Sequence, residues 1–324
     1  MGTHRRGCTS RRASVYHFAT VASVPRTHVL DAPFGIHMTT PDAPIGVFDS
    51  GLGGLSVLDA MRERLPNESM VYIADSGYAP YGEKTDAFIR ERSKAIADWL
   101  VGRGAKMIVV ACNTATTHAI GHLRATQSIP IVGVEPGIKP AALSTASGVV
   151  GVLATAATLR SDRLRALIAA HQARSQFVCQ AGHGLVEQIE QGNLAGAIVD
   201  DLLLRYLTPM AGAGADTVIL GSTHFALLVP TIRRLFGNRF NLIETGSAIA
   251  RRVEVLLNEN KLTADAAENA ATEAQARSRV EYFSSAQSAQ QREALLAVVR
   301  RLPTMGDVEA VASYVDIVHT LTAA

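Results

Sequence analysis

Cysteine is scarce in this sequence, which contains only Cys8, Cys112 and Cys179 among 324 residues. None of the three belongs to a CxxC or Cys/His pattern with zinc-site spacing, and three cysteines are too few for a disulfide framework. This scarcity excludes the small disulfide-rich secreted scaffolds and favours a reducing, cytoplasmic setting.

Long apolar runs and strong net charge are also missing. The longest uncharged run, 140–159, contains only six Leu or Val residues, so we expect a helix end, a loop and a buried strand there and no membrane span. The net charge is +2, and residues 1–38 carry five arginines against the single acid Asp31, which leaves −2 for the rest. No stripe of Lys and Arg interleaved with aromatics follows, so we expect no nucleic-acid partner.

The first 38 residues are rich in Arg, Ser, Thr and His and show no helical or strand periodicity. Their composition is that of a transit peptide. The alternative, which we favour because no apolar signal-peptide segment is present, is an over-extended translation start with Met38 as the true start. We assign residues 1–43 to this leader.

The remaining length suits two domains, and 48% of the residues are hydrophobic, enough to bury a core. From residue 45 onward, short apolar runs alternate with amphipathic stretches, which is typical of an α/β fold with parallel sheets. We expect helices at 85–102 and 161–173, capped by Thr85 and Ser161. The expected strands are 45–48, 70–74, 107–111, 131–134, 149–153, 177–179, 218–220 and 241–243.

Two segments 110 residues apart repeat one pattern: IVVACNTAT at 108–116 and VILGSTHFA at 218–226. Each runs from an apolar strand through a small residue to Cys or Ser and then into the start of a helix. Because open α/β sheets bind ligands at the carboxyl ends of their strands, both turns are candidate sites. Two such sheets facing each other would bring Cys112 and Ser222 to opposite sides of one ligand.

Two loops also follow expected strands. The loop FDSGLGGL at 48–55 either holds an anion on its backbone N–H groups or serves as a structural turn, and it lacks both the dinucleotide and the phosphate-loop patterns. Within it, the side chains of Asp49 and Ser50 suit an ammonium and a carboxylate. The loop GYAPYG at 77–82 is either a rigid connection or a wall of the same cleft.

A lone cysteine is most often a buried apolar residue, which is our expectation for Cys179. Cys112 differs because it stands at a strand-to-helix turn, where the positive end of a helix dipole would favour the thiolate. Both a reactive and a buried structural role stay open for it. A serine nucleophile at Ser222 is not expected, because the surrounding residues do not form G-x-S-x-G.

Four motifs occur in a fixed order: VFDSGLGGLSV at 47–57, PYG at 80–82, VACNTA at 110–115 and LGSTHF at 220–225. Together they resemble the motif set of the glutamate racemases, in the cofactor-independent aspartate/glutamate racemase superfamily, over residues 45 to about 300. The Thr-His pair in the last motif favours the glutamate branch over the aspartate branch.

The resemblance implies two flavodoxin-like, doubly wound parallel-sheet domains related by a pseudo-twofold axis, with the active site in the cleft between them. Domain 1 would comprise 44–137 with 245–305, domain 2 would comprise 138–244, and 306–324 would form a C-terminal tail or helix. The implied activity is that of a cytoplasmic isomerase, independent of pyridoxal phosphate and of any metal, that interconverts L- and D-glutamate for peptidoglycan synthesis. The implied partner is glutamate alone, in a monomer or a homodimer, with no nucleic acid or membrane.

By matching positions, the resemblance implies Cys112 and Ser222 as the catalytic positions, with Asp49, Glu190 and His224 as auxiliary polar groups. The implied substrate-binding residues are Asp49, Ser50, Tyr81, Gly82, Asn113, Thr114, Thr223 and His224. Without an electron sink, a matched acid and base on opposite faces must meet the carbanion, and a thiol can be tuned to either task.

This chain departs from the family at Ser222, where the resemblance implies a second cysteine. A serine hydroxyl is far less acidic than a thiol, so it is a poor base at neutral pH unless a neighbour activates it. Three functions therefore stay open: a glutamate racemase slowed by Ser222, a single-cysteine enzyme such as a decarboxylase, and a glutamate-binding protein without turnover. The glutamate-type motifs favour the first.

Overall fold

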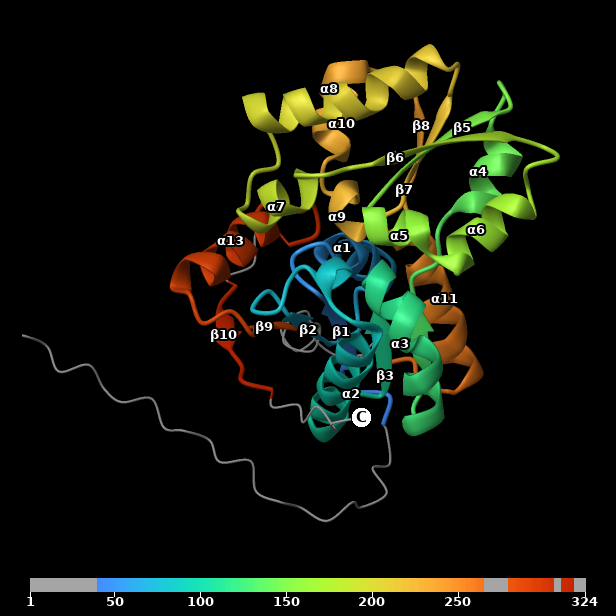
Figure 1. Cartoon of the computed structure of the whole chain (residues 1–324). Coiled ribbons are helices and arrows are strands. Elements are labelled where there is room, and N and C mark those ends of the chain that lie inside the picture. Colours follow the sequence, from blue (N-terminus) through green and yellow to red (C-terminus); the bar gives the residue numbers. More distant parts are fainter. Residues whose placement is uncertain (1–39, 265–278, 306–309, 318–324) are drawn as a thin grey trace, which may run out of the picture. The chain divides into compact units, whose positions relative to one another are not determined.

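Parallel strands form two sheets in this chain, and the computed structural model describes them within residues 40–264, 279–305 and 310–317 (Figure 1). The leader prediction for residues 1–39 lies outside this part. The described residues all belong to one compact unit, which begins at Met38.

The first sheet has six parallel strands in the spatial order β10-β9-β2-β1-β3-β4. Their bounds are β1 Ile45–Asp49, β2 Met70–Ala74, β3 Met107–Val110, β4 Ile131–Gly133, β9 Val280–Ser284 and β10 Ala312–Tyr314. β1 lies in the middle, in register with β2 on one side and β3 on the other. The loops after these three strands therefore meet at one edge.

Both faces of the first sheet are covered, as continuous apolar strands predict. Val47 of β1 packs into a core with one helix pair, whereas the next residue, Phe48, packs into a second core with another pair. The first pair is α1 (Leu55–Arg64) with α11 (Gly246–Glu259), and the second is α2 (Asp86–Gly102) with α3 (Asn113–Thr126). Figure 1 shows α2 and α3 side by side along this sheet.

The second sheet has four parallel strands in the order β6-β5-β7-β8. Their bounds are β5 Val149–Ala154, β6 Gln176–Ala181, β7 Thr217–Leu220 and β8 Asn241–Ile243. Its helices are α4 (Ile138–Ser144), α5 (Ala156–Arg160), α6 (Asp162–Ala169), α7 (Leu185–Glu190), α8 (Ala197–Gly212), α9 (Thr223–Ala226) and α10 (Val229–Phe236). The short 3₁₀ helix η1 (Tyr81–Glu83) follows β2, and α13 (Ala289–Val299) follows β9.

One hydrophobic cluster joins the two sheets. It contains residues of β1, β2 and β3 together with Leu153 of β5 and Val218 of β7. Figure 1 shows α5, α7 and α9 at the junction between the sheets. The carboxyl ends of β1 and β3 therefore face those of β5 and β7 within a shared core.

The α/β class with parallel sheets is confirmed, and each of the eight expected strands is present. The two expected caps are confirmed as well: the hydroxyl of Thr85 accepts a hydrogen bond from the Phe88 N–H at 3.2 Å, and that of Ser161 accepts one from the Leu164 N–H at 3.3 Å. The exact domain boundaries stay a prediction.

Three features differ from expectation. The strands β9 and β10 were not foreseen, and residues 312–314, assigned from sequence to a tail or helix, form β10 beside β9. Both strands carry polar residues among the apolar ones, so neither shows the continuous apolar run of a central strand. Cys179 is exposed and not buried, because β6 is an edge strand.

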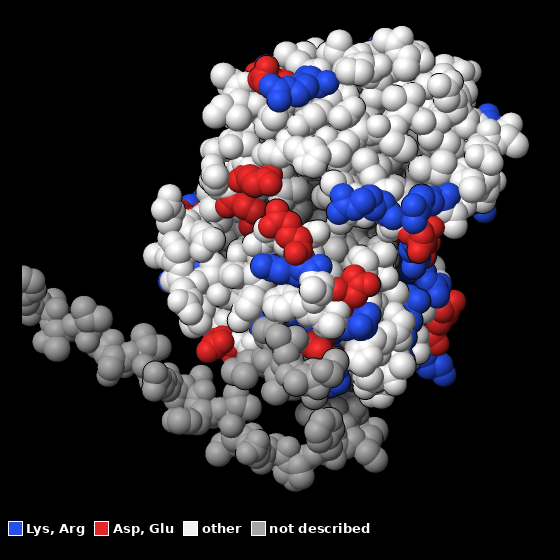
Figure 2. Space-filling view, in the orientation of Figure 1, with Lys and Arg blue, Asp and Glu red and all other residues white. Residues whose placement is uncertain are grey.

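Surface features agree with the absence of a strong net charge. On the face shown in Figure 2, a short band of basic side chains lies beside a group of acidic ones, among mostly uncharged residues. Among the described residues, no helix is both long and apolar enough to cross a bilayer.

Candidate active site

Two strand-to-helix turns place Cys112 and Ser222 at matching positions of the two sheets. The N–H before each residue closes onto the neighbouring strand, from Ala111 to the Phe48 carbonyl at 2.8 Å and from Gly221 to the Leu153 carbonyl at 2.7 Å. Cys112 has φ −125° and ψ 122°, and Ser222 has φ −140° and ψ 138°. The internal repeat in the sequence is therefore a structural repeat.

Both turns open into one cavity of about 210 Å³. That volume is below the roughly 300–1,000 Å³ of pockets that hold drug-sized ligands, so it suits an amino acid better than a nucleotide or a polymer. Ten of the eleven residues singled out in the sequence line it: Asp49, Ser50, Tyr81, Gly82, Cys112, Asn113, Thr114, Ser222, Thr223 and His224. The eleventh, Glu190, lies directly behind His224.

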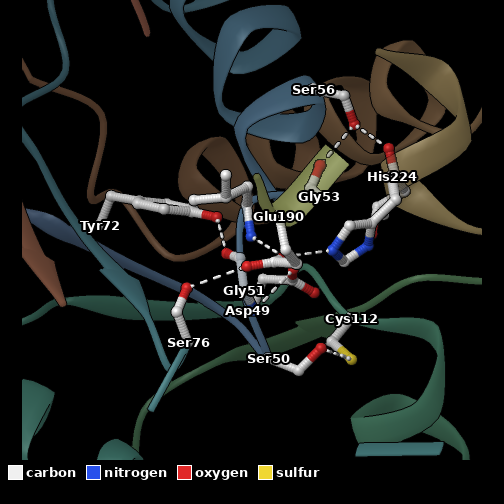
Figure 3. Close-up of polar contacts among 12 residues, drawn as sticks. Asp49, Ser50, Gly51, Gly53, Ser56, Tyr72, Ser76, Cys112, Glu190 and His224 are labelled. Atoms are coloured by element: carbon white, nitrogen blue, oxygen red, sulfur yellow. Dashed lines mark hydrogen bonds and ion pairs between the residues drawn. The ribbon is translucent and has the colours of Figure 1, made fainter. Parts of the chain in front are cut away.

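Cys112 is 4% exposed and is held by two hydrogen bonds. Its thiol lies 3.5 Å from the Ser50 hydroxyl (Figure 3). Its sulfur also accepts a hydrogen bond from the Ala115 N–H at 3.4 Å. Burial, and then the negative charge of Asp49, raise the pKa of the thiol to about 12, and the two hydrogen bonds only partly oppose this. The expectation of a helix-stabilised thiolate is therefore wrong for this arrangement, in which the thiol form of Cys112 is favoured.

His224 and Glu190 form a pair that links α9 to α7. Nε2 of His224 lies 2.7 Å from Oε1 of Glu190, and the same carboxylate accepts from the Leu52 N–H at 2.7 Å and the Ser76 hydroxyl at 3.2 Å (Figure 3). Burial lowers the pKa of His224, but the hydrogen bond to Glu190 and the charge of Asp49 raise it more, so the net direction is upward. This pair favours the imidazolium form of His224.

The glycine-rich loop after β1 surrounds this pair. A Cβ atom at Gly51 would lie 2.0 Å from Oε1 of Glu190, and one at Gly53 would lie 2.2 Å from Nδ1 of His224. Of the two alternatives left open, the anion-binding loop and the structural turn, the structure shows features of both. The loop backbone does bind a carboxylate, but that carboxylate belongs to Glu190 of this chain.

Unpaired polar groups face the cavity near Cys112. Oδ1 of Asp49 and both amide atoms of Asn113 are buried without a hydrogen-bond partner among the described residues. Buried polar groups normally find partners, so these atoms mark where the polar groups of a substrate would bind. Burial raises the pKa of Asp49, and His224 partly opposes the effect.

Sequence reasoning missed several residues that line the cavity: Glu83, Thr155, Ala156, Ala157, Thr158, Arg160, Gly182, His183, Val186 and Glu187. Thr155 follows β5, so the rule that ligands bind at the carboxyl ends of strands could have found it. Gly182 directly follows β6, so the same rule applies to it. The others belong to short helices and loops, whose sequences carry no comparable signal. Within the described ranges, no cluster of three or more His, Cys, Asp or Glu residues could hold a metal ion.

Comparison with known families agrees with this geometry. The family model described as Asp/Glu/Hydantoin racemase matches residues 45–253, the range that contains both turns and the cavity. The chain therefore belongs to the Asp/Glu/Hydantoin racemase family.

Relatives of high identity specify the branch. A glutamate racemase of Cupriavidus pinatubonensis is 55% identical over 220 residues, covering 68% of this chain and 81% of the relative. One of Pseudomonas syringae is 51% identical over 224 residues, covering 69% of this chain and 82% of the relative. Within the family, the glutamate racemase branch is the one that this chain resembles.

Solved structures agree. The glutamate racemase of Escherichia coli, in complex with L-glutamate and the activator UDP-MurNAc-ala, has a TM-score of 0.72 and 36% identity, covering 85% of this chain and 99% of that one. That of Francisella tularensis, in complex with D-glutamate, has a TM-score of 0.69 and 26% identity, covering 86% and 98%. The fold and the family together make the protein an isomerase of the amino-acid racemase class.

Proposed function

We propose that this cleft interconverts L- and D-glutamate by moving the α-proton, with Cys112 on one face of the substrate and Ser222 on the other. One observation carries the proposal: two turns of matching geometry open from the two sheets into a single cavity of amino-acid size. A pair of acid–base positions facing each other is what inversion at a carbon atom requires.

The chemistry needs only proton transfers. A base removes the proton from the α-carbon, leaving the electron pair on a carbanion, and an acid on the opposite face returns a proton to that carbon. The raised pKa of Cys112 makes it the donor in the unliganded site. On the other face, Ser222 acts as the base only after its hydroxyl has given its own proton to solvent, and the resulting alkoxide then takes the α-proton, so proton abstraction there is the slow half of the reaction. In the reverse direction the roles exchange: the Cys112 thiolate takes the α-proton and the Ser222 hydroxyl returns one.

The polar groups of the cavity suit the substrate. The unpaired Asp49 carboxylate oxygen would accept from the substrate ammonium, and the Asn113 amide would bind a carboxylate. Ser50, Tyr81, Gly82, Thr114, Thr223 and His224 would complete the binding site. His224, charged through Glu190, supplies positive charge where the carbanion forms.

The biological setting is part of the same proposal. D-glutamate made here would supply peptidoglycan synthesis in the cytoplasm, in line with the scarcity of cysteine and the glutamate racemase relatives. The homodimer stays a prediction.

Isotope exchange in D2O tests the proposal. Purified protein is incubated with L- or D-glutamate in D2O while circular dichroism follows inversion and mass spectrometry follows deuterium at the α-carbon. We expect inversion of both enantiomers, with deuterium entering one enantiomer faster because the two faces carry different groups. Exchange without inversion would indicate a single-face enzyme, and binding without exchange a binding protein; either result would replace the racemase assignment.

A further inference from the structure

Behind the Tyr81 wall of the cavity lies a fully buried ion pair that the mechanism above does not use. Nη2 of Arg92 lies 2.5 Å from Oδ1 of Asp75, and Nε of Arg92 donates to Oδ2 at 2.9 Å. Both side chains are 0% exposed. This two-point geometry fixes both groups in place, because the planar guanidinium matches the carboxylate at two atoms.

The same carboxylate holds Tyr81. The Tyr81 hydroxyl donates to Oδ2 of Asp75 at 2.6 Å, and Tyr81 itself is 1% exposed at the cavity wall. Burial, followed by the negative charge of Asp75, raises the pKa of Tyr81 well above its usual range, so the phenol keeps its proton and continues to donate. Asp75 therefore anchors η1, the segment that brings Tyr81 and Gly82 to the cavity.

Arg92 also holds the C-terminal part of the first sheet. Its Nη1 donates to the carbonyl of Ile317, two residues after the Val315 N–H donates to the Ser284 carbonyl of β9 at 2.9 Å. The side chains of Val315 and Ile317 pack into the same core cluster as Tyr81 and Cys112. A continuous path of contacts thus runs from Ile317 through Arg92 and Asp75 to Tyr81.

Stability alone is a weak reason for such a pair. Removing two charges from water is costly, and well-packed apolar residues often replace a buried ion pair without loss of stability. A pair whose carboxylate orients a cavity residue, and whose guanidinium binds a distant backbone carbonyl, has a positional role instead. That role accounts for the contacts of the pair with Tyr81 and with Ile317.

We propose that Asp75 and Arg92 are positioning residues that fix Tyr81 at the substrate, and that the segment 315–317 completes this arrangement, so that glutamate binding depends on the C-terminal strand. The proposal rests on the proposed function in one respect, because it takes the cavity beside Tyr81 as the glutamate site. Neither Asp75 nor Arg92 lines the cavity, so both act through Tyr81.

Point variants of the full chain test the path from its centre. Arg92→Lys keeps the charge but loses the two-point contact, and Tyr81→Phe removes only the hydroxyl. We expect each variant to raise KM for glutamate on the order of tenfold, the effect of losing one charge-assisted hydrogen bond, with kcat little changed. Hydrogen exchange should rise at both the η1 amides and the Val315 amide in Arg92→Lys, but only at η1 in Tyr81→Phe.

Chains of two lengths test the path from its end. A chain ending at Tyr314 keeps β10 but lacks the Ile317 carbonyl, whereas a chain ending at Val318 keeps that carbonyl within a peptide bond. The shorter chain should show the raised KM and faster exchange at η1, and the longer one should match the full chain. In a chain that already carries Tyr81→Phe, the truncation should raise KM little further, because both changes break the same series of contacts.

Leu257→Ala is the control for a general loss of stability. It shortens a core side chain of α11, on the opposite face of the first sheet. It should lower the melting temperature without changing KM. An unchanged KM together with unchanged η1 exchange in Arg92→Lys and in the chain ending at Tyr314 would overturn the positioning role. A full chain that neither binds nor converts glutamate would refute the proposed function instead, since the hydrogen-exchange readout needs no substrate.

Discussion

The Cys112 turn and the Ser222 turn have nearly the same backbone but different surroundings. Both residues precede a helix in extended conformation, and both are buried at the same cavity. The sulfur of Cys112 accepts the capping hydrogen bond of α3, whereas the Ser222 side chain makes no such bond to α9. The fold therefore fixes where the two reacting groups stand, and the side chains alone decide what each can do.

The charges near the two turns also differ. Burial, and then the negative charge of Asp49, raise the pKa of Cys112 and favour its thiol form. On the other side, the residue two positions after Ser222 is His224, which Glu190 and Asp49 favour as a cation. One face thus carries a thiol beside the carboxyl group of Asp49, and the other carries a hydroxyl beside a histidine whose pKa is raised. Two turns with the same backbone can therefore carry groups of different acid–base character.

The largest expected effect comes from removing the better of the two groups. Cys112→Ala should lower inversion and α-deuterium exchange by about 10²- to 10⁴-fold, the contribution of one positioned acid or base. Circular dichroism and mass spectrometry in D2O measure the two rates.

The matched control is Cys179→Ala, because this cysteine is exposed on β6 and lies outside the cavity. It should leave both rates unchanged. Exchange that survives Cys112→Ala at the wild-type rate would remove the Cys112 turn from the mechanism and end the comparison.

The second-largest effect is expected from a substitution that gives both turns a cysteine. Ser222→Cys should raise the rate of inversion by about 10²-fold or more, because a thiol replaces a poor base at a position whose backbone already matches that of Cys112. The D2O experiment should also become more even between the enantiomers.

Ser222→Ala separates the hydroxyl from its surroundings. If the Ser222 hydroxyl transfers the proton, Ser222→Ala lowers the remaining inversion further. An inversion rate in Ser222→Cys equal to that of the native chain would contradict the assignment of Ser222 as the second acid–base position.

Much of this site could be predicted from the sequence because strand-to-helix turns are local. The apolar runs before Cys112 and Ser222 placed both residues at the ends of parallel strands, and the structure brings them to one cavity. The other residues inferred from the motifs lie in it or directly behind it. The local sequence pattern and the order of the motifs were sufficient to predict which residues lie at the cavity.

The remaining features depend on contacts that are distant in the sequence. The partner of the glycine-rich loop, Glu190, is 138 residues away from Leu52, and the partner of Asp75 is Arg92 on a helix that the sequence presents only as amphipathic. The raised pKa of Cys112 follows from burial beside Asp49, which no spacing reveals. Long-range packing, and not the local pattern, sets the protonation of this site.

The smallest effect concerns the charge on the Ser222 side. Glu190→Gln keeps the shape of the side chain but removes its negative charge, so the pKa of His224 should fall toward its ordinary value. Activity should drop on the order of tenfold, because a charged hydrogen bond is lost, and the alkaline limb of the rate profile should move to lower pH. NMR titration of the imidazole measures the pKa directly. Glu187→Gln is the graded control, because Glu187 acts on His224 through charge alone and more weakly.

Glu190→Gln should also change how the free energy of unfolding depends on pH. A histidine whose pKa is raised on folding stabilises the folded state fully below its unfolded pKa of about 6.5, and this contribution is lost as the pH rises through the raised folded value. The native chain should therefore exceed Glu190→Gln in free energy of unfolding most below about pH 6.5, and the difference should shrink on the alkaline side. A difference that grows with pH, or a His224 titration unchanged by the substitution, would show that Glu190 does not control the charge on this face. The chemical difference between the two turns would then come only from Ser222 standing opposite Cys112.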